Sequence, residues 1–530
     1  MAHFARTTRI LLAGTACMLL ASCDGADSVA SPGEGVIVVP TTPAPTPAPT
    51  ATPTPAPGTP AASCPAGTND AGVVGNYRGC RLPSSITSDL RLQKLAGVAY
   101  EINGAVNVGV DVGGAGTAPG GRSAVLSIDP GVLLYANTTN ADNDYLIVNR
   151  GSRINAEGTE SQPIIFTAQQ NLTGGVTDES QGLWGGVILA GRAPISNCNA
   201  AVAGGTASCE NVVEGTNTAL YGGAIANDSS GTMRYVQIRY SGTIISPNNE
   251  LQGLTLGGTG SGTTLDHIQI HNSSDDGIEI FGGRTNLRYL ALTGSDDDGL
   301  DTDVGWQGQV QFLLAVQKPT NTQTDNYSTE IDSNGNEDAL PRQRYNLANF
   351  TFVQSSTATN AAIRIRGGAD ARFVNGIVVS PAACLNIIAG IDASGKSTIR
   401  PANAGLEDNG PPMFDSVLFS CGGASPYAET TVNGVTVTIA EQRTVFTAGT
   451  NNVEAGTGLL TGIFLPAGAA TTATPFNAAT LNPANTSFFV QTSFVGAVSG
   501  PNDTSFRGWT CNSNRANFGS TSGSCTGLPN

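Results

Sequence analysis

A short apolar pattern recurs along the middle of the chain, and its spacing constrains the fold more than any other feature. In each copy, apolar side chains alternate with polar ones over a short run. Runs begin at Leu265, Leu287 and Val310, which are 22 and 23 residues apart, and a later pair begins at Leu347 and Ala371, 24 residues apart. Such alternation predicts β-strands. A repeat of this length predicts that successive strands stack as coils of a solenoid.

The composition favours the same architecture. Glycine occupies 67 of 530 positions and only 12% of the residues are charged, whereas helical surfaces normally carry many Glu, Lys and Arg. Glycine and asparagine tolerate the positive φ angles of tight turns. Leucine-rich repeats share the period, but their spacing of Leu and Asn is absent. We therefore expect an all-β protein folded as a right-handed parallel β-helix.

The N-terminus is typical of a bacterial lipoprotein precursor. A short apolar stretch is followed by Leu20–Cys23 (LASC), which resembles the lipobox in which the cysteine receives the lipid. Prolines at nearly alternate positions in Pro40–Pro60 favour an extended stalk. We expect a lipid anchor on Cys23 and a location at the outer membrane or cell surface of a Gram-negative bacterium. An ordinary secreted protein released from the cell is the alternative.

The repeat and the composition divide the chain into five segments. Residues 422 to 505 lose the repeat and become rich in Ala, Thr and Asn. A cap is expected after the last coil, since a bare coil would leave an open strand edge. The expected segments are a signal peptide (1–22), the lipidated cysteine with a linker (23–62), an N-terminal cap region (63–125), the parallel β-helix (126–421), and irregular late coils with a C-terminal cap (422–530).

Eight cysteines remain when the signal peptide and Cys23 are set aside. An even number outside the cytoplasm predicts disulfide bonds. Pairing of nearest neighbours is the simplest arrangement and closes short loops at 64–80, 198–209 and 511–525, although eight cysteines allow 105 pairings. The eight are Cys64, Cys80, Cys198, Cys209, Cys384, Cys421, Cys511 and Cys525.

Several motifs resemble a family of secreted or lipid-anchored proteins from Bacteroidetes and sphingomonad-type bacteria. They are Leu126–Val132 (LSIDPGV), Gly182–Ile195 (GLWGGVILAGRAPI), Asp275–Gly283 (DDGIEIFGG) and Phe506–Trp509 (FRGW). The resemblance covers most of the chain after the linker and implies a pectate-lyase-like β-helix. Members of that family are largely uncharacterised, and some are described as transporters or secretion-system substrates. The resemblance therefore implies a fold and leaves the activity open.

An acidic constellation is the strongest candidate for a functional site. Its two groups of carboxylates are 22 residues apart, so at one coil per repeat the second group lies on the first. Like charges on strands about 4.8 Å apart are unfavourable unless a cation, water or raised pKa values compensate. Calcium is the natural cation for clustered carboxylate oxygens, whereas solvated turn carboxylates are the simpler alternative. The groups are Asp275, Asp276 and Glu279, and Asp297, Asp298 and Asp301.

A second candidate calcium site lies shortly after these coils. Asp332, Asn334, Asn336 and Asp338 alternate around Gly335, as the oxygen ligands of a calcium loop do. The stretch lacks the full EF-hand pattern and its terminal glutamate. Spacing alone supports this prediction.

Catalysis is the alternative that the same region supports. Asp276, Asp298 and Asp301 are candidate catalytic carboxylates, and Arg364 and Arg366 fall on a later coil. Pectate lyases combine calcium with a basic residue, whereas polygalacturonase-like enzymes pair aspartates around a water. The histidine and Arg-x-Lys elements of those hydrolases are missing here. A simpler role for the two arginines is to neutralise acidic residues of the neighbouring coil.

Two histidines, His267 and His271, are expected on one face of a strand. They suit a metal pair or an acid–base site, but solvent-facing side chains are the simpler expectation. Motifs of serine hydrolases, zinc proteases and nucleotide-binding proteins are absent from the sequence.

These features leave two classes of function open. The leading hypothesis is a non-catalytic surface module for binding, adhesion or structure, stabilised by calcium and presented to a glycan or another surface protein. An accessory of an outer-membrane transporter is a variant. The other class is a lyase or hydrolase of acidic polysaccharides. Nucleic acid is excluded as a partner, because a net charge of −16 with only three lysines leaves little to displace phosphate counterions.

Overall fold

The structure, a computed structural model, is dominated by parallel β-strands. Within the described part of the chain, its helices are α1 (Gln169–Thr173), α2 (Ile439–Ala448) and the 3₁₀ helices η1 (Ala404–Leu406), η2 (Gly468–Thr471) and η3 (Ala478–Thr480). No helix among the residues described is long and apolar enough to cross a membrane. The signal peptide, Cys23 and most of the linker lie outside the described residues, which are 58–139, 143–216, 218–246, 249–320, 323–333, 335, 337–391, 395–481 and 487–529.

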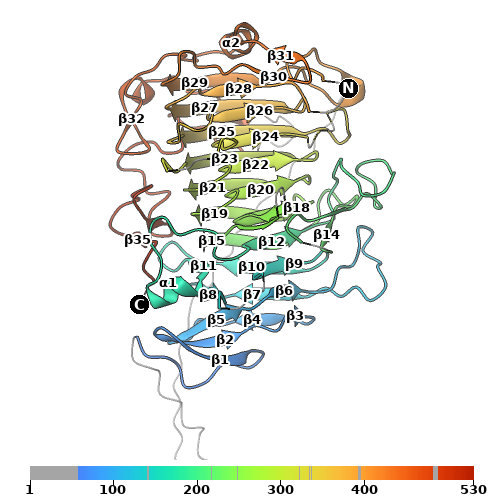
Figure 1. Cartoon of the computed structure of the whole chain (residues 1–530), viewed down its shortest axis with the longest axis vertical. Helices are drawn as coiled ribbons and strands as arrows, with labels where there is room; N and C mark the ends of the chain where they lie inside the picture. The colour runs from blue at the N-terminus through green and yellow to red at the C-terminus, as the bar shows by residue number, and fades with distance from the viewer. Residues whose placement is uncertain are drawn as a thin grey trace, which may run out of the picture. The chain divides into compact units, whose positions relative to one another are not determined.

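Two sheets carry the coils (Figure 1). Apart from the antiparallel β1–β2 pair, all strand pairs within the two sheets are parallel, and along most of each sheet neighbours belong to successive passes of the chain. This topology confirms the expected all-β parallel β-helix. The larger sheet contains β1 (Asn69–Val74), β2 (Tyr77–Arg81), β4 (Leu90–Leu92), β5 (Val98–Ile102), β7 (Val125–Ile128), β8 (Leu133–Ala136), β10 (Arg153–Glu157), β11 (Ile164–Ala168), β15 (Gly231–Arg239), β19 (Thr264–His271), β21 (Asn286–Thr293), β23 (Gln307–Val316), β25 (Arg344–Val353), β27 (Asp370–Ser380) and β29 (Met413–Cys421).

The smaller sheet carries the shorter strands of the same coils. It contains β3 (Ser85–Ile86), β6 (Ala105–Val108), β9 (Tyr145–Val148), β12 (Val187–Ala190), β18 (Leu254–Gly257), β20 (Ile278–Phe281), β22 (Leu300–Asp303), β24 (Thr329–Ile331), β26 (Ile363–Ile365) and β28 (Leu385–Ile387). Excursions from the coils form two-stranded pairs: β13 (Asn211–Val212) with β14 (Leu220–Tyr221), β16 (Thr243–Ser246) with β17 (Asn249–Leu251), β30 (Thr430–Val432) with β31 (Val435–Val437), β32 (Leu460–Thr461) with β33 (Leu465–Pro466), and β34 (Cys511–Asn512) with β35 (Gly523–Ser524).

Rows of apolar side chains fill the interior of the coils. Leu265, Leu287 and Val310 fall in register on β19, β21 and β23, and all three are buried. Full burial of one such side chain contributes about 1.5–3 kcal/mol, so a row repeated on every coil stabilises the stack. The predicted repeat is therefore the inward-facing row of the β-helix.

The long strands of the larger sheet bend at one residue each. At this position φ is positive, which side chains other than glycine adopt rarely, and the pairing of β15 with β19 omits Tyr235 and His267. The bend stacks rings of successive coils, with centroids of His267 and Tyr289 4.3 Å apart. The expectation of solvent-facing histidines is wrong, because His267 lies in this stack and His271 is fully buried. Burial lowers the pKa of His271 to about 3, so it stays neutral.

The parallel strands begin before residue 126, where the β-helix was expected to start. Strand β2 already pairs with β5, and β3 with β6, in parallel registers. The antiparallel strand β1 covers the first edge of the larger sheet by pairing with β2. The expected cap region 63–125 thus contains the first coils, whose repeat is hidden by very short strands and a long loop after β6.

The end of the chain differs from the expected late coils. Helix α2, which begins at a capping box of Thr438 and Glu441, packs on β29 and covers the last coil. Residues 449–481 and 487–529, here together called the C-terminal strap, then run back along the larger sheet (Figure 1). Val490 N–H donates to Gln311 of β23 (2.9 Å), and Cys511 N–H donates to Gln269 of β19 (2.6 Å). The strap therefore covers the side of the coils, whereas α2 covers their end.

All eight predicted cysteines form disulfides. The bonds are Cys64–Cys80, Cys198–Cys209, Cys384–Cys421 and Cys511–Cys525. The three short loops expected from nearest-neighbour pairing are confirmed.

Candidate metal centre

The smaller sheet places two of the predicted acidic residues, Glu279 and Asp301, in one column. Glu279 of β20 pairs with Asp301 of β22, Asp301 pairs with Glu330 of β24, and Glu330 pairs with Arg364 of β26. The residues next to Glu279, Ile278 and Ile280, belong to the apolar core. Because side chains alternate along a strand, the side chains of this column point away from the core. The stacking of Glu279 and Asp301 is the register that the 22-residue spacing predicts.

The turns that lead into β20 and β22 explain the repeated Asp-Gly sequence. Asp276 Oδ1 accepts a hydrogen bond from the N–H of Asp298 (2.7 Å), and Asp298 Oδ1 accepts one from the N–H of Tyr327 (2.5 Å). The glycine after each aspartate allows the coils to approach, because a Cβ on Gly277 would lie 2.6 Å from the carbonyl oxygen of Gly299. Each aspartate therefore ties its turn to the next coil.

A cavity of about 530 Å³ collects the acidic side chains. Among the described residues that line it, twelve are carboxylates and Arg366 is the one cation. Gln252, Phe281 and Ile391 complete the lining. The carboxylates are Glu214, Glu250, Asp275, Asp276, Glu279, Asp297, Asp298, Asp301, Asp303, Asp325, Glu330 and Asp332.

Three of these acids come from excursions that the sequence analysis did not connect with the site. Glu214 follows β13, Glu250 lies on β17, and Asp325 precedes β24. None of them belongs to the repeat, so the strand register does not place them. In the sequence, each of them is an acidic residue in a loop insertion next to an acidic coil. Such residues are too common to be assigned to the lining of a cavity from the sequence.

Burial raises the pKa of several cavity carboxyls, and repulsion from neighbouring acids adds to the effect. Burial, followed by repulsion from Glu250, raises the pKa of Asp275 to about 8, and that of Glu214 rises to about 7. The pKa values of Asp276 and Glu279 are also raised well above the ordinary range by burial and by neighbouring acids. At neutral pH the cavity therefore requires bound protons or bound cations.

The two predicted arginines neutralise only the far end of the cavity. Nε of Arg366 lies 2.7 Å from Glu330 and 2.9 Å from Asp332. Arg364 forms an ion pair with Asp325. Both arginines thus take the simpler of the two roles expected for them, and the acids on β20 and β22 are left without a direct cationic partner in the described part of the chain.

Two groups of three carboxylates have the spacing of metal ligands. In each group, one oxygen from every residue lies within 4.8 Å of the others. Asp298, a predicted ligand and catalytic candidate, lines the cavity but belongs to neither group. The groups are Asp275, Asp276 and Asp297, and Asp276, Glu279 and Asp301.

The second predicted calcium loop has its carboxylates engaged elsewhere. Asp332 pairs with Arg366, and Asp338 pairs with Lys396 and with Arg400. The other two predicted ligands, Asn334 and Asn336, lie outside the described residues. The described part of this loop therefore offers no free acidic ligand.

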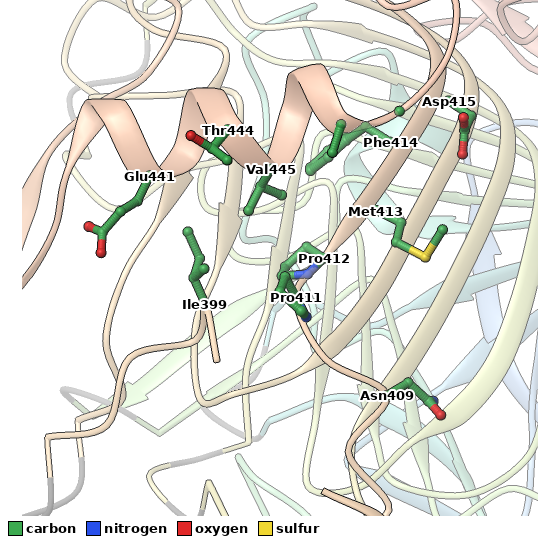
Figure 2. A pocket seen from close by; sticks show the side chains of 12 residues that line it. Ile399, Asn409, Pro411, Pro412, Met413, Phe414, Asp415, Glu441, Thr444 and Val445 are labelled. Atoms are coloured by element: carbon green, nitrogen blue, oxygen red, sulfur yellow. The ribbon is translucent and has the colours of Figure 1, made fainter. Parts of the chain in front are cut away.

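A second hollow of about 520 Å³ lies beneath the cap helix α2 and is mainly apolar. Its polar groups already have partners, since Asp415 accepts a hydrogen bond from Thr450 N–H (2.8 Å) and Glu441 caps the helix. The hollow has none of the clustered charge of the acidic cavity. Figure 2 shows its lining, with Glu441, Thr444 and Val445 on the helix and Ile399, Pro411, Pro412 and Met413 below.

Comparison with known proteins concerns the fold. No curated protein and no solved structure matches the chain significantly. The family model described as pectate-lyase like beta helix domain matches residues 112–459, which is more than half of the chain and includes every strand of the acidic cavity. The chain therefore belongs to the family of pectate-lyase-like beta-helix domains.

Proposed function

We propose that the protein is a non-catalytic binding module of the bacterial cell surface whose acidic cavity holds calcium. The observation that carries the proposal is the pair of three-carboxylate groups in a cavity with twelve acids and one arginine. Buried carboxylates require compensation by cations or protons. Calcium accepts six to eight oxygen ligands in irregular geometry, which suits acids from several turns and strands. Bound calcium would stabilise β20 and β22 against each other.

The proposal includes a lipid anchor at Cys23 and a place at the outer membrane or cell surface. The lipobox and the proline-rich linker support it, and four disulfides suit an oxidising compartment. The proposed partner is a glycan or another surface protein, and an accessory role beside an outer-membrane transporter is the variant. A Cys23→Ser variant that stays in the membrane fraction as fully as the wild type would contradict the anchor.

Calcium binding is expected in isothermal titration calorimetry of the purified protein. Asp276→Asn removes a ligand from both three-carboxylate groups, so affinity should fall at least about tenfold. Asp129→Asn is the matched control, because Asp129 pairs with the exposed Arg91 outside the cavity and its loss should leave binding unchanged. Absence of calcium binding by the wild type would overturn the proposal.

A polysaccharide lyase or hydrolase is the second candidate function. Asp276, Asp301 and Arg366 line one cavity, and a carboxyl whose pKa is raised by burial suits a general acid. Under the leading proposal, a panel of polyuronates and neutral glycans yields no product with calcium or with chelator. Product formation that Asp301→Asn abolishes would establish the enzyme instead.

A further inference from the structure

We infer that the acidic cavity holds two calcium ions and that Asp276 is a ligand of both. The inference rests on the proposed function and adds the number of ions and the assignment of ligands. Asp276 is the one residue common to the two three-carboxylate groups. A carboxylate offers two oxygens, and paired metal ions in proteins are about 3.5–4 Å apart, a separation that one carboxylate can bridge.

The ligands on the two sides of Asp276 come from different parts of the coils. Asp275 and Asp297 lie in the turns before β20 and β22, whereas Glu279 and Asp301 lie on those strands. The turn group and the strand group are therefore separate sets. A single ion held by the turn group would leave the strand carboxylates uncompensated.

Glu279 gives independent support for an ion in the strand group. Its side chain lines the cavity and is only 7% exposed. No hydrogen bond or ion pair satisfies its carboxylate within the described residues, whereas Asp275 accepts from Gln252 (3.3 Å) and Asp276 accepts from Asp298. Burying an unpartnered carboxylate costs several kcal/mol. A cation on its own side of Asp276 would compensate the carboxylate of Glu279.

The two three-carboxylate groups share Asp276 and so contain five carboxylates, whose total charge also favours two ions. Arg366 is already shared between Glu330 and Asp332 and so provides no direct partner for these five acids. One divalent ion would leave three of the five negative charges uncompensated, whereas two ions would leave one. In a buried site, where charges interact strongly, the second arrangement is much less costly.

The cavity has room for two ions with their water ligands. Its volume is about 530 Å³, and one water molecule occupies about 30 Å³. Each group supplies three carboxylates, and calcium takes six to eight oxygens, so bound waters would complete both coordination shells.

Native mass spectrometry of the intact protein, dialysed against calcium, counts the ions directly. We expect two per chain in the wild type, one in Glu279→Gln, one in Asp297→Asn, and two in the control Asp129→Asn. Circular dichroism of each variant verifies that the fold is retained.

The outcomes separate this inference from the proposed function. One ion per wild-type chain would overturn the two-ion site and leave calcium binding intact, whereas no ion would overturn both. Two ions in Glu279→Gln would contradict the role assigned to Glu279.

Discussion

Without calcium, the protein is expected to lose stability as the pH rises from about 4 to about 8. Burial raises the pKa of Asp275 to about 8 and that of Glu214 to about 7, whereas both types of carboxyl titrate near pH 4 in an unfolded chain. Between these values the folded state holds protons that the unfolded state has released. Rising pH therefore favours unfolding. The midpoint of thermal unfolding in chelator should fall by on the order of 5 °C across this range.

Calcium should remove this dependence, because it compensates the ionised carboxylates. At pH 8 the stabilisation by calcium should therefore be larger than at pH 5, where protons already neutralise part of the cavity. Differential scanning calorimetry at both pH values, with calcium and with chelator, measures the four midpoints. Equal midpoints with calcium and with chelator at pH 8 would contradict a cation site in the cavity.

The Asp276→Asn variant gives a sharper form of the same prediction. Asparagine can still accept the hydrogen bond from Asp298, but it buries no negative charge. In chelator at pH 8, Asp276→Asn should therefore unfold at a higher temperature than the wild type. In calcium the order should reverse, because the variant lacks a shared ligand. A variant that is less stable under both conditions would indicate that Asp276 acts only as a turn residue.

The coils could be predicted from the sequence because every coil must bury apolar side chains at the same positions. One inward row of apolar residues is needed on every coil, so Leu265, Leu287 and Val310 recur at the spacing of the coil itself. The first coils escaped prediction because β3 has only two residues, which is too short for an alternating pattern. Cysteine pairing was accessible because short loops favour neighbouring partners.

The candidate metal centre could be predicted only where it follows the register. Glu279 and Asp301 share a column because one repeat separates them, and the register likewise places Arg364 of a later coil beside Glu330. Glu214 and Glu250 reach the cavity on excursions whose paths depend on tertiary packing. The repeat does not determine the paths of such loops. The contribution of these two residues to the cavity could therefore be recognised only in the structure.

The C-terminal strap could not be predicted from the sequence for a related reason. Many of its hydrogen bonds to the coils join side chains of the larger sheet to the backbone of the strap, as in the bond from Gln237 to the carbonyl of Trp509 (2.6 Å) and the pair formed by Gln269 with Cys511. Backbone groups carry no residue-specific signal. An irregular composition in 449–529 was therefore compatible with late coils as well as with a lateral strap.

Replacing Trp509 should cause a large loss of stability. Its ring is 1% exposed and meets His267 edge-on (5.3 Å between centroids), so it fixes the strap to the column of bent strands. Removing a buried tryptophan ring costs about 3–5 kcal/mol. Trp509→Ala should lower the free energy of unfolding by that amount in denaturant titrations.

The matched control for Trp509 lies on the same strap. Val490 is 45% exposed and contributes its backbone, which Val490→Ala leaves in place, to the bonds with Gln311. This substitution should change the unfolding free energy by less than about 0.5 kcal/mol. If the strap is needed to seal the side of the coils, Trp509→Ala should also expose residues 449–529 to limited proteolysis at lower protease concentrations than the control. Equal stability and equal cleavage of the two variants would contradict the role of Trp509 in fixing the strap to the larger sheet.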